Sequence, residues 1–102
     1  MADIVVVGAG TAGIPCAILA AQAGATVAVI EKDDRIGGTL HVSAGHMSGA
    51  GTRRQREKGI ADDTVELHFE DVMRLSRGEA DEALVRLAVE EAPATIDWLH
   101  DL

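Results

Sequence analysis

The chain has 102 residues, the size of one small domain, and hydrophobic residues make up 47% of it although aromatic residues make up only 2%. Its formal net charge of −8 repels phosphate backbones and anionic lipid headgroups, so we expect no nucleic-acid partner. A single cysteine excludes a disulfide within the chain, and one thiol cannot assemble a zinc site, so we predict no metal site.

Two short apolar runs with a helical stretch between them open the chain. The runs Ile4–Val7 and Val27–Ile30 predict parallel strands, and the first has no polar alternation, so we expect it to be fully buried. The alanine-rich stretch between them predicts a helix from about Thr11 to Ala23. Pro15 falls in the first turn or so of that helix, where its missing N–H removes no intrahelical hydrogen bond. The pattern predicts an α/β, Rossmann-like fold.

A glycine-rich loop, residues 8–13, joins the first strand to the helix. Gly8 permits a tight turn, Gly10 lets a phosphate approach bare backbone, and Gly13 lets the helix lie close to the strand. The positive end of the helix dipole would then face a pyrophosphate. Glu31 ends the second strand 18 residues after Gly13 and can accept both hydroxyl protons of an adenosine ribose. The sequence therefore predicts half of a dinucleotide site.

A glycine pair, Gly37-Gly38, follows Glu31 within several residues. A simple NAD enzyme has no need of this pair. In the two-dinucleotide-binding flavoproteins, such a pair lets the chain pass close to the cofactor. The glycine loop, Glu31 and the glycine pair together resemble the signature of that family, and the resemblance implies FAD as the cofactor.

The stretch from residue 37 to residue 50 resembles the flavoprotein subunits of fumarate reductases and succinate dehydrogenases, including soluble flavocytochrome-like reductases and related ketosteroid dehydrogenases. Small side chains at positions 43–45 leave room for an isoalloxazine ring. Thr39 stands where membrane-bound succinate dehydrogenases carry a flavin-linking histidine, so we expect FAD to be noncovalent. His46 replaces the family's usual second glycine; it could donate a hydrogen bond or a proton, or only fill space.

The residues predicted to bind FAD come from the glycine loop, the end of the second strand, and the glycine pair with the segment after it: Gly8, Gly10, Thr11, Ala12, Gly13, Glu31, Lys32, Gly37, Gly38, Thr39, Leu40, Ala44, Gly45 and His46. For Thr39, Leu40, Gly45 and His46 this role is implied by the family resemblance. Cys16 is expected to fill space in the core beneath the loop, with a reactive thiol as the alternative.

From Gly59 onward the chain predicts helices. Asp63 and Glu66 have the spacing of a capping box, and a shared apolar face predicts a core, with Val65, Phe69, Val72 and Met73 along it. A basic cluster at residues 53–56 is expected to be a solvated loop, with complementarity to an anionic ligand as the alternative.

A second helix is expected to start near Asp81, with Leu84, Leu87 and Ala88 on one side and the acidic pair at 90–91 on the other. Pro93 fits the first turn of a third helix, which would point Ile96 and Leu99 inward beside Trp98. This helical half also resembles the fumarate reductase-like group. Acidic pairs such as residues 70–71 and 90–91 are expected to form a solvated face.

We expect residues 1–102 to be the N-terminal part of one FAD-binding domain, truncated at Leu102. Residues 1–58 would form the dinucleotide-binding βαβ unit with the flavin loop, and residues 59–102 a helical segment. In family members the residues that bind substrate and deliver the proton lie beyond the equivalent of Leu102, so we predict no catalytic residue here and little activity from this chain alone. The remainder of the same polypeptide is then an expected partner.

The resemblance implies an FAD-dependent oxidoreductase that transfers hydride between the flavin and a C–C single or double bond next to a carbonyl or carboxylate. Its substrate would be a small unsaturated carboxylate or ketone. Two alternatives stay open. One is another flavoprotein of the superfamily, such as an amine oxidase or a disulfide reductase, although the paired cysteines of a reductase are absent. The other is a noncatalytic module that binds FAD or NAD.

The apolar stretch at residues 4–20 does not match a secretory leader, since Asp3 is negative and the first cation is Lys32. No stretch has the length and purity of a membrane span. We therefore expect a cytoplasmic location.

Overall fold

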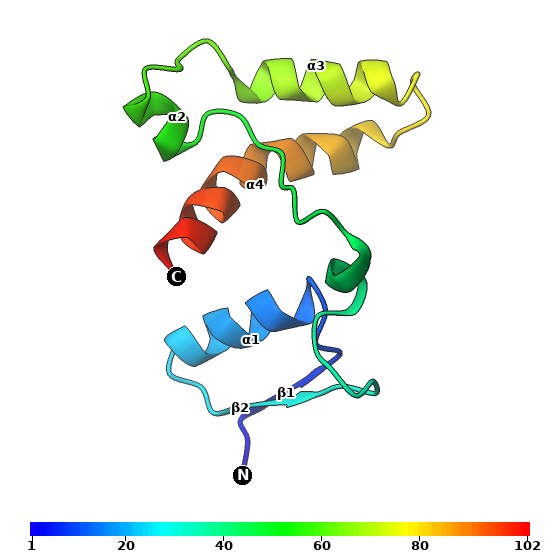
Figure 1. Ribbon diagram of the computed structural model, residues 1–102, viewed down its shortest axis with the longest axis vertical. Coiled ribbons are helices and arrows are strands. Elements are labelled where there is room, and N and C mark those ends of the chain that lie inside the picture. The colour runs from blue at the N-terminus through cyan, green and yellow to red at the C-terminus, as the bar shows by residue number, and fades with distance from the viewer. The chain divides into compact units, whose positions relative to one another are not determined.

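The computed structural model describes residues 1–102, which form two compact units, residues 1–46 and residues 47–102. This division lies earlier in the chain than the one expected after residue 58. The elements in chain order are β1 (Ile4–Val7), α1 (Gly13–Gln22), β2 (Val27–Ile30), the 3₁₀ helix η1 (Gly38–Val42), α2 (Arg53–Glu57), α3 (Val65–Leu75) and α4 (Glu82–Asp101) (Figure 1). None of the helices combines the length and the apolar character that crossing a bilayer requires.

The first unit is a βαβ arrangement. Strands β1 and β2 have the predicted bounds and pair in parallel, with Ile4 opposite Val27 and Val7 opposite Ile30. Helix α1 connects them and lies along one face of the pair (Figure 1). It begins at Gly13 rather than Thr11, and Pro15 occupies its first turn as predicted. The α/β, Rossmann-like prediction is confirmed.

Strand β1 is not fully buried, which corrects the expectation from its composition. Val6 is only 9% exposed because it faces α1, whereas Val5 and Val7 are 55% and 81% exposed. Successive side chains of a strand point to opposite faces, and a parallel strand is buried on both only when both are covered. In residues 1–46 a helix covers one face alone.

The second unit consists of α2, α3 and α4, with α3 beside α4 (Figure 1). Its core contains Phe69 from α3 and Val89 from α4, both buried. The Arg86 guanidinium lies 3.5 Å from the centre of the Phe69 ring and donates two hydrogen bonds to the Glu66 carboxylate. This pairing lowers the pKa of Glu66. The predicted core face of α3 is confirmed.

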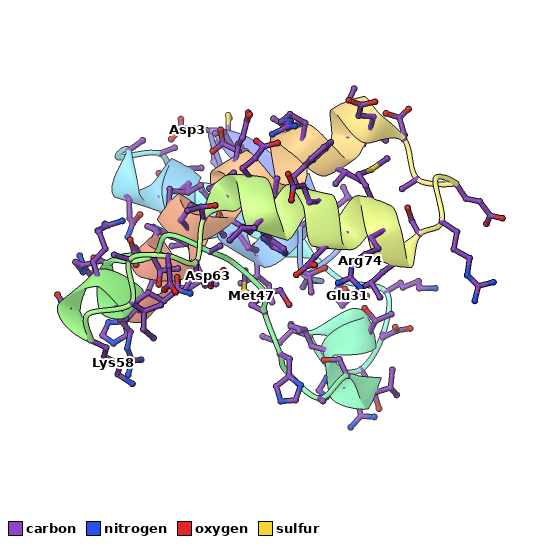
Figure 2. All side chains as sticks on the ribbon, turned by 90° about the horizontal axis from the view of Figure 1, so that it is seen from above. Asp3, Glu31, Met47, Lys58, Asp63 and Arg74 are labelled. Carbon is purple, nitrogen blue, oxygen red and sulfur yellow. The ribbon has the colours of Figure 1, made fainter.

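The cap of α3 differs from the predicted box. Thr64 is the N-cap, and its hydroxyl accepts a hydrogen bond from the Leu67 N–H at 3.2 Å. Asp63 lies next to α2 (Figure 2), where its carboxylate accepts a hydrogen bond from the Gln55 side chain. Because that carboxylate and Glu66 both have partners on other elements, the helix starts one residue later than the motif indicates.

Helix α4 is one continuous helix, so the predicted separate third helix is wrong. Residues 90–92 are Glu, Glu and Ala, which favour a helix and offer no N-cap side chain to begin a new one. Pro93 lies inside α4 and leaves the Val89 carbonyl without an intrahelical partner, and the helix changes direction midway in Figure 1.

The buried face of α4 is only in part the one expected. Ile96 turns inward as predicted, but Leu84, Leu87 and Leu99 are exposed, and the other residues that turn inward are Val85, Val89 and Ala92. This face is selected by the packing of Gly49, where an added Cβ would lie 2.4 Å from the Ile96 side chain and 3.4 Å from that of Ala92. The acidic pairs at 70–71 and 90–91 are exposed, as predicted.

The basic cluster at residues 53–56 is the helix α2, not a loop. Thr52 is buried, and it forms a capping box in which the Gln55 N–H donates to its hydroxyl while the Gln55 side chain accepts from its N–H. The Arg53 guanidinium donates to both oxygens of Asp101, at 3.1 and 2.5 Å. The Arg53 N–H donates to both oxygens of Asp97, at 3.0 Å each. Helix α2 is therefore joined to α4 by charged acceptors.

We predict that Asp97→Ala destabilises the intact protein by about 1–2 kcal/mol, because it leaves the Arg53 N–H without its charged acceptor. Urea titration followed by circular dichroism measures the change. Glu91→Ala, at an exposed position of the same helix, is the control and should lie within about 0.5 kcal/mol of the parent. Equal stability of the two variants would contradict the role assigned to Asp97.

Candidate functional site

The glycine loop brings β1 and α1 into close contact. Gly8 has φ +98°, which a residue with a side chain rarely adopts. A Cβ added at Gly13 would lie 1.8 Å from the Gly8 carbonyl oxygen and 3.3 Å from the Val6 side chain. The start of the helix is therefore held against the strand, as the sequence predicts for this glycine.

The N-terminus of α1 is suited to an anion. The helix has no side-chain cap and no acidic residue in its first turn, so the chain itself does not neutralise its positive end. Nothing lies within 4 Å of a Cβ added at Gly10, so the backbone there borders open space. Free N–H groups beside open space fit the pyrophosphate that the sequence predicts.

Glu31 stands at the end of β2, where Figure 2 labels it, and its carboxylate faces backbone donors. One oxygen, Oε2, accepts a hydrogen bond from the Ala9 N–H at 2.7 Å. The other, Oε1, accepts from the Lys32 and Asp33 N–H groups at 2.8 and 3.1 Å. These bonds, that from Ala9 above all, lower the pKa of Glu31. The carboxylate is thus ionised and oriented before any ligand binds.

The glycine pair contacts the glycine loop directly. The Gly37 N–H donates to the Ala9 carbonyl at 2.7 Å, and a Cβ added at Gly38 would lie 3.8 Å from the Cα of Gly10. Gly37 and Gly38 have φ of +112° and +53°. Ala9 is only 1% exposed. The Gly-Gly pair therefore passes beside the loop, as the resemblance implies.

The segment after the pair is the 3₁₀ helix η1 and an extended stretch. Thr39 and Leu40 lie in η1 and are exposed, and Ala44, Gly45 and His46 follow it and are exposed as well. Within this stretch the Ser43 hydroxyl donates to the Leu40 carbonyl and accepts from the Gly45 N–H. Beside η1 lies a surface cavity of about 570 Å³ lined by Lys32, Asp33, Asp34, Arg35, Gly38, His41 and Val42.

The structure brings three predicted segments together in residues 1–46: the glycine loop, the Glu31 carboxylate and the glycine pair. No hydrogen bond joins the side chain of Thr39 or of His46 to these segments, and both residues are exposed. Ala9 and His41 belong to the site but were not predicted, since an alanine between glycines and a histidine outside a motif carry no pattern. Cys16 is exposed on α1, so the expectation that it fills the core is wrong. No group of three or more histidine, cysteine or acidic side chains is placed to hold a metal ion.

Residues 3–102 match a protein family described as the FAD binding domain. The chain is 45% identical over 100 residues to an NADH:fumarate oxidoreductase of Klebsiella pneumoniae strain 342, covering 97% of this chain and 11% of that protein.

Two solved structures have a similar fold, each 36% identical to the chain and each covering 98% of it. The open conformation of a flavocytochrome c3 fumarate reductase superposes with a TM-score of 0.82 over 18% of its own chain. A 3-ketosteroid-Δ4-(5α)-dehydrogenase from Rhodococcus jostii RHA1 superposes with a TM-score of 0.80 over 21% of its chain. The chain thus spans a small part of the proteins that it matches.

We predict that Gly13→Ala lowers the stability of the intact protein by about 1–3 kcal/mol, because the added Cβ meets the Gly8 backbone. Gly10→Ala is the matched control in the same loop, since its Cβ would meet nothing within 4 Å. Thermal unfolding measures the stability of each variant, and we expect Gly13→Ala to unfold at a lower temperature than Gly10→Ala. A Gly13→Ala protein as stable as Gly10→Ala would refute the close packing at the start of α1.

We also predict that Glu31→Gln loses stability in a pH-dependent manner. A lowered carboxyl pKa stabilises the fold above the ordinary carboxyl pKa, and this contribution disappears as the pH falls through the lowered value. The parent should therefore melt above the variant near pH 7, and the difference should shrink as the pH falls below the ordinary carboxyl pKa and vanish once the Glu31 carboxylate is protonated in the folded protein. Glu70→Gln, at an exposed position without an ion pair or hydrogen bond of its side chain, should show no such pH-dependent difference. A difference independent of pH would exclude the carboxylate as its cause.

Proposed function

The chain belongs to the family of FAD binding domains, and from this we propose that it is the cofactor-binding part of an FAD-dependent oxidoreductase of the fumarate reductase and succinate dehydrogenase type. The observation that carries the proposal is the double contact of Ala9. Its N–H donates to Glu31 and its carbonyl accepts from Gly37, so that the three parts of the FAD signature are held at one place.

The residues of the first unit fit the adenosine diphosphate half of FAD. The start of α1 would receive the pyrophosphate at Gly10, Thr11 and Ala12. Glu31 would accept a ribose hydroxyl. A carboxylate has about four acceptor sites, and three backbone N–H groups already occupy three of them, so about one remains on Oε2. We therefore revise the expectation that Glu31 accepts both ribose hydroxyls to one.

The flavin half would extend along the glycine pair and the segment after it. Gly38, Thr39 and Leu40 would border it first, and the small residues Ala44 and Gly45, with His46, would lie further along. Threonine has no ring nitrogen with which to attach the flavin, so we propose noncovalent FAD. Lys32 directly follows Glu31, and its N–H donates to that carboxylate, so we propose that Lys32 helps to bind the adenosine half of FAD by holding Glu31 in place.

When bound, FAD supplies hydride transfer at its flavin N5, which interconverts a C–C single and double bond next to a carbonyl or carboxylate. The proteins similar to this chain are named for fumarate and for a 3-ketosteroid, which supports a small unsaturated carboxylate or ketone as substrate. The residues of this chain would bind and orient the cofactor. We propose that the groups that bind substrate lie elsewhere in the same polypeptide and that the enzyme is cytoplasmic.

Purified intact protein should show the absorbance bands of flavin, and acid precipitation should release the flavin into solution if it is noncovalent. Glu31→Ala and Gly10→Val should each weaken FAD binding by about 10-fold to 100-fold, since one removes the charged acceptor and the other fills the space at the helix start. Fluorescence titration of the cofactor-free protein measures this, with Glu70→Gln as the control.

The substrate class is tested with a panel in which the redox state of the flavin matches the reaction. Fumarate and an unsaturated 3-ketosteroid are mixed with the reduced flavoprotein, which must supply the hydride, and simple amines with the oxidised flavoprotein, which must accept it. Turnover of an unsaturated acid or ketone supports the proposal. Turnover of amines would favour the amine oxidase-like alternative. FAD binding without turnover of any compound would favour a noncatalytic module. Unchanged FAD occupancy in both Glu31→Ala and Gly10→Val would overturn the site itself.

A further inference from the structure

His41 is a polar group in the site that no motif accounts for. Its Nε2 lies 2.6 Å from the carbonyl oxygen of Ile36, five residues earlier. A carbonyl oxygen can only accept, so Nε2 must carry the proton and donate. The ring also lies against Gly37, where an added Cβ would be 3.0 Å from Nε2. The His41 side chain therefore closes the turn that contains the glycine pair.

The Ile36 carbonyl and the Gly37 N–H belong to one peptide group. No peptide bond of the chain is cis, so these two atoms point to opposite sides of that group. The His41 side chain donates to the Ile36 carbonyl of this peptide group, and the Gly37 N–H of the same group donates to the Ala9 carbonyl at 2.7 Å. Two hydrogen bonds thus fix the plane of the Ile36–Gly37 peptide.

The Ala9 carbonyl in turn belongs to the peptide group whose N–H is that of Gly10. Because this peptide is also trans, the Gly10 N–H points away from Gly37. Hydrogen bonds in a chain polarise one another, so a donor at one end strengthens the donor at the other. The order is His41, the Ile36–Gly37 peptide, the Ala9–Gly10 peptide, and finally the Gly10 N–H beside open space.

We propose that His41 is a positioning residue that orients and polarises the Gly10 N–H, through two intervening peptide groups, toward the pyrophosphate of FAD. The inference rests on the proposed function for the identity of the anion. The hydrogen bonds themselves lie within the chain and can be tested without FAD.

The test uses three substitutions of His41 that separate the donor from bulk and polarity. The amide nitrogen of glutamine occupies the place of Nε2, whereas that of asparagine occupies the place of Nδ1 and falls short of the Ile36 carbonyl. His41→Leu and His41→Asn should weaken FAD binding by about fivefold, the effect of one lost hydrogen bond. His41→Gln should restore binding to within about twofold. Glu70→Gln, at an exposed position of α3 and outside the proposed site, should bind FAD like the parent.

Hydrogen exchange of the Gly37 amide in the cofactor-free protein is the second readout. It should be about fivefold faster in His41→Leu and His41→Asn than in the parent and His41→Gln. The amides in the second half of α1, which belongs to the same unit, should stay unchanged and so report that this unit is intact. Unchanged Gly37 exchange in His41→Leu, or a His41→Gln variant as impaired as His41→Leu, would overturn the proposal. Absence of FAD from the parent would instead refute the proposed function, and Gly37 exchange would still decide the role of His41.

Discussion

Ala9 is the residue on which the first unit depends. Its N–H and its carbonyl are both taken by segments far away in the sequence, Glu31 and Gly37, and it is almost completely buried. A buried backbone polar group without a partner costs free energy, so the glycine loop cannot move without breaking contacts to both segments. The requirement to satisfy one residue's backbone thus holds the loop, the strand end and the glycine pair together.

This arrangement also makes the proposed anion site compatible with a net charge of −8. The negative charge nearest the loop, that of Glu31, is directed onto three backbone N–H groups. The start of α1 has neither a cap nor an acidic side chain, so its N–H groups and its dipole remain directed at open space. Local backbone geometry therefore outweighs the overall charge, which acts only over longer distances and is screened by salt.

Several expectations about caps and buried faces failed where the local sequence allows two alternatives equally well. Asp63 and Thr64 can both cap α3, and the choice depends on Gln55, which binds Asp63 from another helix. The inward face of α4 was assigned to leucines together with Ile96, but the side packed against Gly49 has Ile96 and Ala92, and the leucines Leu84, Leu87 and Leu99 are exposed. In both cases the deciding partner is distant in the sequence, and no periodicity reports it.

The sequence by itself determined both strands, the glycine loop, the position of Glu31 and the family, because these follow from short-range spacing and from backbone conformations that only glycine adopts easily. Only the tertiary structure decided which acceptor each backbone N–H finds, that Glu31 is largely occupied by the chain itself, and that His41 closes the glycine turn. Hydrogen bonds between distant segments depend on how closely those segments approach, and that distance is set by packing rather than by any local pattern.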